Sequence, residues 1–345
     1  MIVPAYNEAA RLPDTLEAIL DLGSAKTEII FVDDGSTDST LSILEAATED
    51  NPYAQVVAAP RNRGKGAAVR LGMAQARGRA LVFMDADLAT DLSGLEPLIR
   101  ALDDHQVAIG SRSVNGTVIH DASAKRKRMG ASFNRLVRSA TDIPFEDTQC
   151  GFKAFRAPIG KLLFALGRID GFAFDVEVLT LARQLDLGVK EIPIQWRQVE
   201  GSHVRPIADA LRMSRDVIRA RRPKLDAPAR VCSARFPCAP GTEYALRSEI
   251  LAHVRSFDLA MALDGSVLLL APFIRPQHME QVVQRLAGVA DPTTVEVAGL
   301  DAGAVLQVVR NSRTDRFAEA VHHHSTAVPC DRSLSPVPAL DLTLI

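Results

Sequence analysis

Apolar residues follow two periods along the first 112 positions of the chain. Short runs rich in Val, Ile and Leu predict strands, and the segments between them place apolar residues every three or four positions, as amphipathic helices do. The predicted strands are 1–4, 28–32, 55–58, 80–84 and 107–109, and the predicted helices are 13–22, 39–49, 65–76 and 92–103. This alternation favours a doubly wound α/β fold, with a mostly parallel sheet between two layers of helices.

The pattern becomes less regular and more basic after position 112. It predicts a helix ending near 139, a loop at 142–151, a helix at 173–185, a strand at 190–195 and a basic helix at 207–222. Pro223 and Pro228 then interrupt the pattern and indicate a linker.

The last third of the chain has a different rhythm. It predicts strands at 230–236, 259–263, 267–270 and 294–298, and helices at 243–255 and 277–286. Asp264-Gly265 between two of the strands is a strong hairpin signal. The resulting β-α-β-β-α-β order is typical of a small ferredoxin-like α+β domain.

Four parts of the chain follow from these patterns. They are an α/β domain over 1–222, a linker at 223–229, a small α+β domain at 230–300 and a tail at 301–345. The tail is rich in His, Ser and Pro and is expected to be poorly ordered. Because the linker is bounded by prolines, we expect the first domain to fold without the rest.

The composition of the chain disfavours several classes of protein. The formal net charge is −2, so no global field attracts nucleic acid or an anionic membrane. No run of about 20 apolar residues is present, which predicts a chain without a transmembrane segment. The four cysteines, which form no C-x-x-C pair, favour a reducing, cytoplasmic setting. They are Cys150, Cys232, Cys238 and Cys330.

Polar motifs follow the predicted strands. They are V-P-A-Y-N-E at 3–8, V-D-D-G-S-T-D at 32–38, N-R-G-K-G at 62–66 and D-A-D at 85–87. Each motif alone is common, and Asp38 has a plain alternative interpretation as a helix cap. The four together predict one site, because ligands of such folds bind beyond the carboxyl ends of the strands.

The residue types in these motifs suit a nucleoside diphosphate sugar. Asp34, or Asp33, and Glu8 offer hydrogen-bond acceptors to a base and a ribose. Asp85 and Asp87 are hard oxygen ligands for Mg²⁺ or Mn²⁺, which would stabilise a departing diphosphate. Lys65 lies between two glycines at a helix start, where backbone amides favour anions.

The motif set resembles the family-2 inverting glycosyltransferases of the GT-A fold, over about residues 1–222. D-A-D-L-A-T at 85–90, D-T-Q-C-G-F-K at 147–153 and F-A-F-D-V-E at 172–177 are similar to motifs of dolichyl-phosphate β-glucosyltransferases. Those enzymes move glucose from UDP-glucose to a polyprenyl phosphate. The related GDP-mannose-dependent mannosyltransferases carry Gln where this chain has Ala89, which favours the glucosyl branch.

The resemblance implies roles for individual residues. The donor would contact Pro4, Tyr6, Glu8, Asp33, Asp34, Lys65, Asp85 and Ala86, with Asp85 and Asp87 on the metal. The acceptor phosphate would bind Arg112, Arg126 and Arg128, since guanidinium groups suit bidentate phosphate contacts. The expected catalytic residues are Asp87, Asp147 and Asp175, with Glu177 as a further candidate base. Asp175 and Glu177 also suit a helix start for purely structural reasons.

Three other functions stay open. The same fold could glycosylate a soluble acceptor, could use GDP-mannose, or could bind a nucleotide sugar without catalysis. A dinucleotide-binding dehydrogenase is disfavoured, because no G-x-G-x-x-G follows the first strand. The basic helix at 207–222 is either a peripheral contact to the inner face of the membrane or a helix packed on the core with a solvated basic face.

Overall fold

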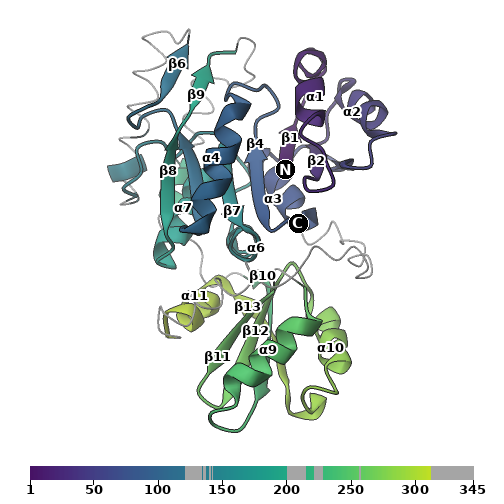
Figure 1. Cartoon of the computed structure of the whole chain (residues 1–345), viewed down its shortest axis with the longest axis vertical. Coiled ribbons are helices and arrows are strands. Elements are labelled where there is room, and N and C mark those ends of the chain that lie inside the picture. The colour runs from purple at the N-terminus through teal and green to yellow at the C-terminus, as the bar shows by residue number, and fades with distance from the viewer. Residues whose placement is uncertain are drawn as a thin grey trace. The chain divides into compact units, whose positions relative to one another are not determined.

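The computed structural model describes residues 1–120, 134, 137–139, 141, 143–199, 215–220, 228–255 and 258–311. The chain divides into two compact units (Figure 1). One holds residues 1–156 and 167–223, and the other holds residues 157–166 and 224–344.

A seven-stranded sheet forms the centre of the first unit, in the order β3-β2-β1-β4-β7-β5-β8. The strands are β1 Ile2–Ala5, β2 Ile29–Asp33, β3 Ala54–Ala58, β4 Ala80–Met84, β5 Val107–Ser111, β7 Phe152–Arg156 and β8 Val189–Pro193. All neighbours pair in parallel except β7, which is antiparallel to both β4 and β5. The predicted mostly parallel α/β sheet is confirmed, whereas β7 was missing from the prediction.

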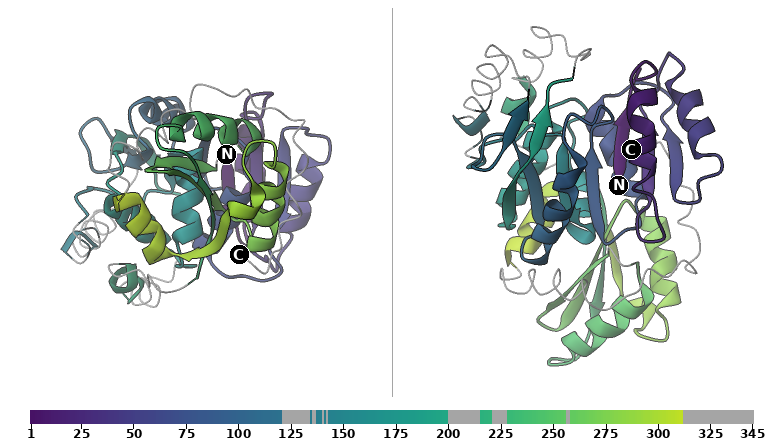
Figure 2. Two further views of the ribbon diagram at one scale, coloured as in Figure 1. Left: turned by 90° about the horizontal axis from the view of Figure 1, so that it is seen from below. Right: turned by 45° about the horizontal axis from the view of Figure 1, so that its top comes forward.

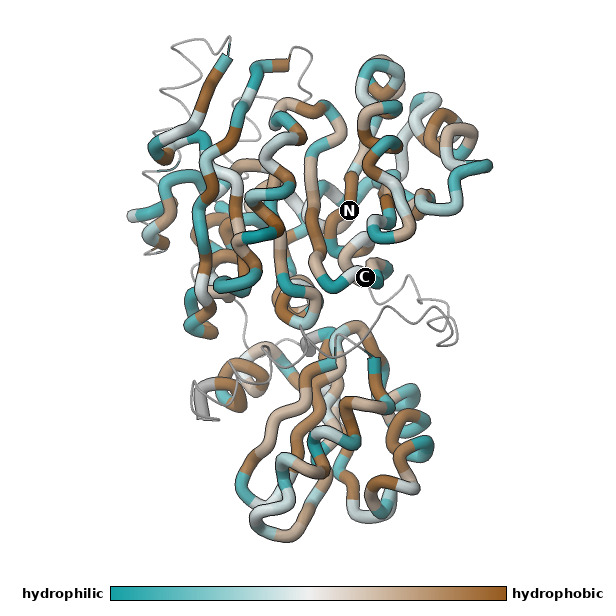
Figure 3. Tube along the Cα trace, in the orientation of Figure 1, coloured by the Kyte–Doolittle hydropathy of each residue, from teal (hydrophilic) through white to brown (hydrophobic). Residues whose placement is uncertain are grey.

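Helices cover both faces of this sheet. They are α1 Leu12–Leu20, α2 Thr40–Thr48, α3 Lys65–Gln75, α4 Leu95–Arg100 and α7 Phe174–Gln184, with 3₁₀ turns at Leu92–Gly94 and Ala101–Asp103. Helix α3 packs on β1 and β2 so closely that a Cβ at Gly72 would overlap the side chain of Ile2. Hydrophobic stretches, brown in Figure 3, occur along strands and helices alike, and the residues of β2, β5 and β7 are all buried. Burying this apolar surface supplies the main stabilisation of the unit.

A small two-stranded ladder stands beside the main sheet. Strand β6, Val118–His120, pairs in parallel with β9, Gln195–Arg197. The segment that follows β4 joins this ladder, because Thr90 bridges Trp196 and the amide of Arg197 donates to Ala89 O at 2.8 Å. The only tryptophan thereby lies next to the D-A-D motif.

The second unit has the predicted β-α-β-β-α-β order, formed by β10 Pro228–Pro237, α9 Glu243–His253, β11 Leu259–Leu263, β12 Ser266–Pro272, α10 Pro276–Arg285 and β13 Glu296–Asp301. Its sheet order is β11-β12-β10-β13 and every pair is antiparallel (Figure 2). Alternate residues of the strands, such as Phe236 and Leu269, form one buried cluster with Ile250 of α9 and Met279 of α10. The ferredoxin-like prediction is confirmed.

Two helices differ from the predicted division of the chain. Helix α6, Ala157–Leu166, was not predicted, and its ten residues are all buried. It contacts β10 and β12 and clusters with the second unit, although it follows β7 directly in the chain. Helix α11, Ala302–Asn311, packs on β13 where a poorly ordered tail was expected to begin, because Val305, Leu306 and Val309 form an apolar face.

No helix within the described part of the chain is both long enough and apolar enough to cross a membrane.

Candidate active site

The polar motifs meet at one edge of the large sheet. The carboxyl ends of β1, β2, β4 and β5 lie there because these strands run in one direction. Strand β7 runs the other way, so its amino end reaches the same edge and pairs Met84 with Phe152. The D-T-Q-C-G-F-K motif, which begins at Asp147, therefore lies beside the D-A-D motif, and the amide of Asp85 donates to Gly151 O at 3.1 Å.

The loops after β1 and β2 are tied to each other. The amide of Asn7 donates to Ser36 Oγ at 3.0 Å, and the amide of Thr37 donates to Asn7 Oδ1 at 2.8 Å. Asp38 accepts from the amides of Ala9 and Thr40, at 3.2 and 2.9 Å, so it joins the two loops. These contacts hold the first two motifs in one fixed arrangement.

Three predicted donor residues lie on or just after β1. Pro4 is within the strand and opposite Val32, and Tyr6 follows it with 38% of its surface exposed. Both carboxylate oxygens of Glu8 are bound by the guanidinium of Arg11, one of them at 2.6 Å from Nε. Tyr6 is thus the accessible side chain here, and Glu8 carries its own counter-ion.

Asp33 and Asp34 have different surroundings. Asp34 accepts from the amides of Arg63 at 3.1 Å and Gly64 at 2.7 Å, one with each oxygen. Burial raises the pKa of Asp34 to about 6, although these two hydrogen bonds oppose the rise. Asp33 accepts only from the amide of Ser36, and its Oδ1 is buried with no partner among the described residues. Of the two carboxylates, Asp33 is the one with an acceptor to offer a ligand.

Lys65 forms an ion pair with Asp85. Burial alone would lower the pKa of Lys65, but attraction to Asp85, Asp175 and Asp87 outweighs it and raises the pKa. The backbone at this helix start differs from the expectation. The amides of Gly66 and Ala67 already donate to Asp170 O, so they do not stand open to an anion.

Asp85 and Asp87 end β4 with Ala86 buried between them. Asp87 Oδ1 accepts from the amide of Ala89 at 3.1 Å, and Leu88 between them has a left-handed φ of 49°. Burial and the charge of Asp85 raise the pKa of Asp87. Two carboxylates that repel each other, with a lysine ammonium as the counter-ion, fit a divalent cation.

Within the described part of the chain, Asp85 and Asp87 are the two carboxylates that could bind a metal together. Among the described residues, no group of three or more His, Cys, Asp and Glu side chains could hold an ion together. The rest of a coordination shell would come from water and from the donor phosphates, which is the usual arrangement for Mg²⁺.

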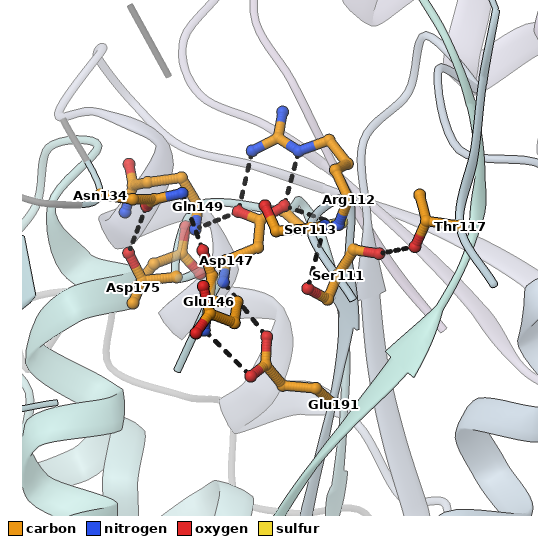
Figure 4. A network of polar contacts seen from close by, with 12 residues as sticks. Ser111, Arg112, Ser113, Thr117, Asn134, Glu146, Asp147, Gln149, Asp175 and Glu191 are labelled. Atoms are coloured by element: carbon orange, nitrogen blue, oxygen red, sulfur yellow. Dashed lines mark hydrogen bonds and ion pairs between the residues drawn. The ribbon is translucent and has the colours of Figure 1, made fainter. Parts of the chain in front are cut away.

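Arg112 and Asp147 form a bidentate pair (Figure 4). Arg112 Nε and Nη2 donate to the two carboxylate oxygens at 2.6 and 2.9 Å, and the amide of Arg112 donates at 3.0 Å. Asp147 is fully buried, and the pair lowers the pKa of Asp147 against the effect of burial. Glu191 on β8 holds the loop from the other side by accepting from the amides of Glu146 and Asp147.

This geometry argues against Asp147 as a base, because both of its oxygens are engaged and its low pKa makes it a poor proton acceptor. It orients Arg112 instead. Arg112 also lies over the ring of Trp196, 5.7 Å from the ring centroid, and its side chain is 31% exposed. Among the described residues, no partner engages its Nη1, which leaves the two N–H groups of that nitrogen for a ligand.

Asp175 lies on the first turn of α7 and forms a buried ion pair with Lys153 at 2.7 Å. Lys153 Nζ also donates to Cys150 O at 2.6 Å and lies 5.4 Å from the ring centroid of Phe83. Burial raises the pKa of Asp175, while Lys153 and Lys65 oppose the rise. Lys153 is fully buried and was missed by the sequence analysis, which took it only as part of a motif.

The comparisons with known proteins identify the family of the chain. A family model described as "Glycosyl transferase family 2" matches residues 1–159. A protein named dolichyl-phosphate beta-glucosyltransferase from Dictyostelium discoideum is 33% identical over 238 residues, which is 64% of this chain and 73% of that protein. The chain belongs to glycosyltransferase family 2. Proteins of the same name from Drosophila melanogaster and Homo sapiens are 39% and 32% identical, over 63% of this chain and 72% and 73% of their own lengths.

The solved structures similar to this family-2 glycosyltransferase include glucosyl-3-phosphoglycerate synthase from Mycobacterium tuberculosis in complex with Mn²⁺, UDP and glucosyl-3-phosphoglycerate. That chain is 20% identical with a TM-score of 0.49, over 64% of this chain and 76% of that chain. The first unit has a GT-A-like mixed α/β fold, with its large sheet mostly parallel.

The remaining predicted site residues of the glycosyltransferase are the acceptor arginines Arg126 and Arg128 and the candidate base Glu177. Arg126 and Arg128 lie outside the described residues. Glu177 Oε2 accepts from the amides of Arg168 and Ile169, at 2.7 and 2.8 Å, so this carboxylate holds the loop before α7. Burial raises the pKa of Glu177.

Proposed function

We propose that this glycosyltransferase moves glucose from UDP-glucose to dolichyl phosphate or another polyprenyl phosphate, with inversion at the sugar carbon. The observation that carries the proposal is the group formed by Asp85, Asp87 and Lys65 at the sheet edge. It offers two oxygen ligands and one ammonium to a diphosphate, in a chain whose family relatives bear the name of this activity.

The donor would lie along the carboxyl ends of β1, β2 and β4. The buried Oδ1 of Asp33 accepts from none of the residues that the structure describes, which suits a hydroxyl or N–H of the nucleoside. Asp85 and Asp87 would hold Mg²⁺ or Mn²⁺, which when bound neutralises charge on the departing UDP. When the donor binds, the Lys65 ammonium would donate to the diphosphate instead of to Asp85. The ammonium would thus exchange one anionic partner for another.

The acceptor phosphate would meet Arg112. Its guanidinium is held by Asp147 and lies over the ring of Trp196, and no described residue engages its Nη1, whose N–H groups can donate to the phosphate. A phosphate is an anion near neutral pH and needs little help from a general base, unlike a sugar hydroxyl. Direct attack by its oxygen, on the face opposite the UDP, inverts the sugar carbon in one displacement.

Asp175 suits the sugar better than the acceptor oxygen. Its carboxylate is 4% exposed and bound on one oxygen by Lys153, so it is fixed beside Lys65 and Asp85. A fixed carboxylate can accept a hydrogen bond from a glucose hydroxyl and orient the ring for the displacement.

Peripheral contact with the cytoplasmic face of a membrane would bring the enzyme to its lipid. The short helical segment 215–220 exposes Ile218, at 67%, on the same stretch as Arg215 and Arg219. Apolar and basic side chains together favour an anionic interface.

The test incubates the purified protein with radiolabelled UDP-glucose or GDP-mannose, with and without dolichyl phosphate, in Mn²⁺ or excess EDTA. Labelled lipid should form only from UDP-glucose with dolichyl phosphate and metal. Asp87→Asn should lower the rate at least about 100-fold, since a metal ligand is lost. Asp91→Asn, four residues on, is the matched control, because the carboxylate of Asp91 accepts from Ser93 and lies outside the D-A-D motif.

Full activity in excess EDTA would show that the transfer needs no metal ion. Label transferred to a water-soluble product, or from GDP-mannose alone, would replace the proposed substrates.

A further inference from the structure

The first turn of α3 is capped by a distant loop. Its N-cap residue Gly64 has no side chain to accept from the turn. Asp170 O accepts from the amides of Gly66 and Ala67, at 2.8 and 3.2 Å. The Gly66 amide, which a helix start leaves without a partner, is therefore satisfied by a carbonyl more than 100 positions away, and the Ala67 amide shares its hydrogen between that carbonyl and Gly64 O at 2.9 Å.

The side chain of Asp170 also binds α3 and the residues just before it. Its two oxygens accept from Arg63 Nη2 at 2.9 Å and from Arg70 Nη1 at 2.6 Å. Arg70 also donates through Nη2 to Ile169 O at 3.0 Å, and it is 1% exposed. The two arginines stand on either side of Lys65 in the sequence, so Asp170 holds the segment both before and after it.

The glycines on either side of Lys65 permit this contact. A Cβ at Gly64, where φ is 116°, would lie 2.5 Å from Asp170 O. A Cβ at Gly66 would lie 2.5 Å from Ile169 O. Both distances are far below van der Waals contact, so the G-K-G sequence is explained by the close approach of these two loops.

The Asp170 loop is itself fixed. The amides of Arg168 and Ile169 donate to the buried carboxylate of Glu177, as described above. On its other side the N-R-G-K-G segment is held by Asp34, through the amides of Arg63 and Gly64. Lys65 thus stands between two anchors, Asp34 and Asp170.

We infer that Asp170 is a positioning residue for the donor: it fixes the first turn of α3 so that the ammonium of Lys65 reaches the diphosphate. This inference rests on the proposed function, because it takes UDP as the ligand of Lys65. Asp170 acts through Lys65, because its ion pairs with Arg63 and Arg70 fix the backbone on both sides of Lys65.

The test compares the affinities of Asp170→Asn for UDP and for UMP, in Mn²⁺, by calorimetry. Loss of the position of Lys65 should weaken UDP binding about tenfold, the lower range for a charge-assisted hydrogen bond. UMP lacks the outer phosphate and should bind within about twofold of the wild type. In a Lys65→Met background, Asp170→Asn should have less than a twofold further effect, because coupled residues are not additive.

Two further variants complete the experiment. Arg70→Lys keeps the buried charge but loses the contact to both Asp170 and Ile169, so it should weaken UDP binding in part and spare UMP. It decides the matter by the same measurements if Asp170→Asn does not fold. Asp258→Asn removes the carboxylate from an Arg–Asp pair in the second unit and should change thermal stability but not the UDP to UMP ratio.

Equal losses for UDP and UMP, or full additivity with Lys65→Met, would overturn the inference and leave the proposed function standing. A wild-type protein that bound neither nucleotide would overturn both.

Discussion

The position of Asp85, a proposed metal ligand, depends on one residue without a side chain. Gly151, at the amino end of β7, lies against the carboxylate of Asp85, and a Cβ there would overlap its Cγ and Oδ2. Its carbonyl accepts from the amide of Asp85, so the two backbones cannot move apart without breaking that hydrogen bond. The position of Asp85 is therefore set by the neighbouring strand as well as by its own.

We expect Gly151→Ala to turn the Asp85 carboxylate away from the metal. Activity in Mn²⁺ should fall at least about 100-fold, because a ligand of the cation is displaced. Thermal unfolding should change by only a few degrees, since Asp85 is partly exposed and can rotate outward. Activity against Mn²⁺ concentration, together with a melting curve, provides the measurement.

Gly288→Ala is the control, because nothing lies within 4 Å of a Cβ at that position. A Gly151→Ala enzyme with wild-type activity and metal dependence would show that Asp85 does not need its present orientation.

Asp34 gives the protein a pH dependence that can be measured. Folding raises its pKa from 3.8 to about 6, chiefly through burial. The folded state then binds the proton more tightly than the unfolded state, so this group reduces stability as pH rises from about 4 to about 6 and adds no further change above that. We expect the unfolding free energy of the wild type, relative to Asp34→Asn, to fall by about 2 kcal/mol over this range once solvent screening is allowed for.

Urea unfolding of both proteins between pH 4 and pH 7 tests this expectation. A constant difference between them across the range would mean that Asp34 titrates alike in the folded and unfolded chains.

The acidic residues of the site could be predicted because strand ends and motif order place them. Asp33, Asp85, Asp87 and Lys65 were expected at one sheet edge, and the topology brings the ends of their strands there. Which oxygens stay available could not be predicted, because the amides that occupy Asp34 come from a loop 29 residues away. Asp170 was missed for the same reason, since nothing near it in the sequence shows what its carbonyl binds.

At the scale of elements, the helices and parallel strands of residues 1–112 follow their hydrophobic periods closely. Strand β7 was missed because Lys153 and Arg156 interrupt the apolar residues of Phe152–Arg156, so the segment lacks the continuous apolar run of a buried strand. Both are buried, Lys153 against Asp175 and Arg156 against the carbonyls of Leu102 and Asp103. A buried charge that finds its partner in another element leaves no local signal.

Helix α6 was missed for a different reason. All ten of its residues are buried, so it lacks the polar face on which a helical period depends. Such a run is predicted poorly by pattern alone, because a short apolar segment suits a strand equally well.

At the scale of the whole molecule, α6 changes the expectation for a shortened chain. A protein ending at Pro223 would keep α6 but lose β10 and β12, on which it packs. Each large apolar side chain of α6 contributes about 1.5–3 kcal/mol by burial, and losing several of them rivals the whole stability of a domain. We expect this truncation to be insoluble or to unfold at a much lower temperature, contrary to the expectation from the linker.

A protein ending at Asn311 keeps every described element and should melt like the full chain. Melting temperature and UDP affinity of the two truncations give the comparison. A chain of residues 1–223 that is soluble and binds UDP normally would show that α6 does not need those strands.

Helix α6 also has a consequence for how the protein is made. A ribosome completes α6 about 100 residues before it completes β12. At roughly 5–20 residues per second, the helix waits for roughly 5–20 s without the strands that bury it. During that time an apolar segment is held in an unfinished chain, where a chaperone can bind it and where neighbouring nascent chains can associate through it. Slow translation before β12 would lengthen this interval.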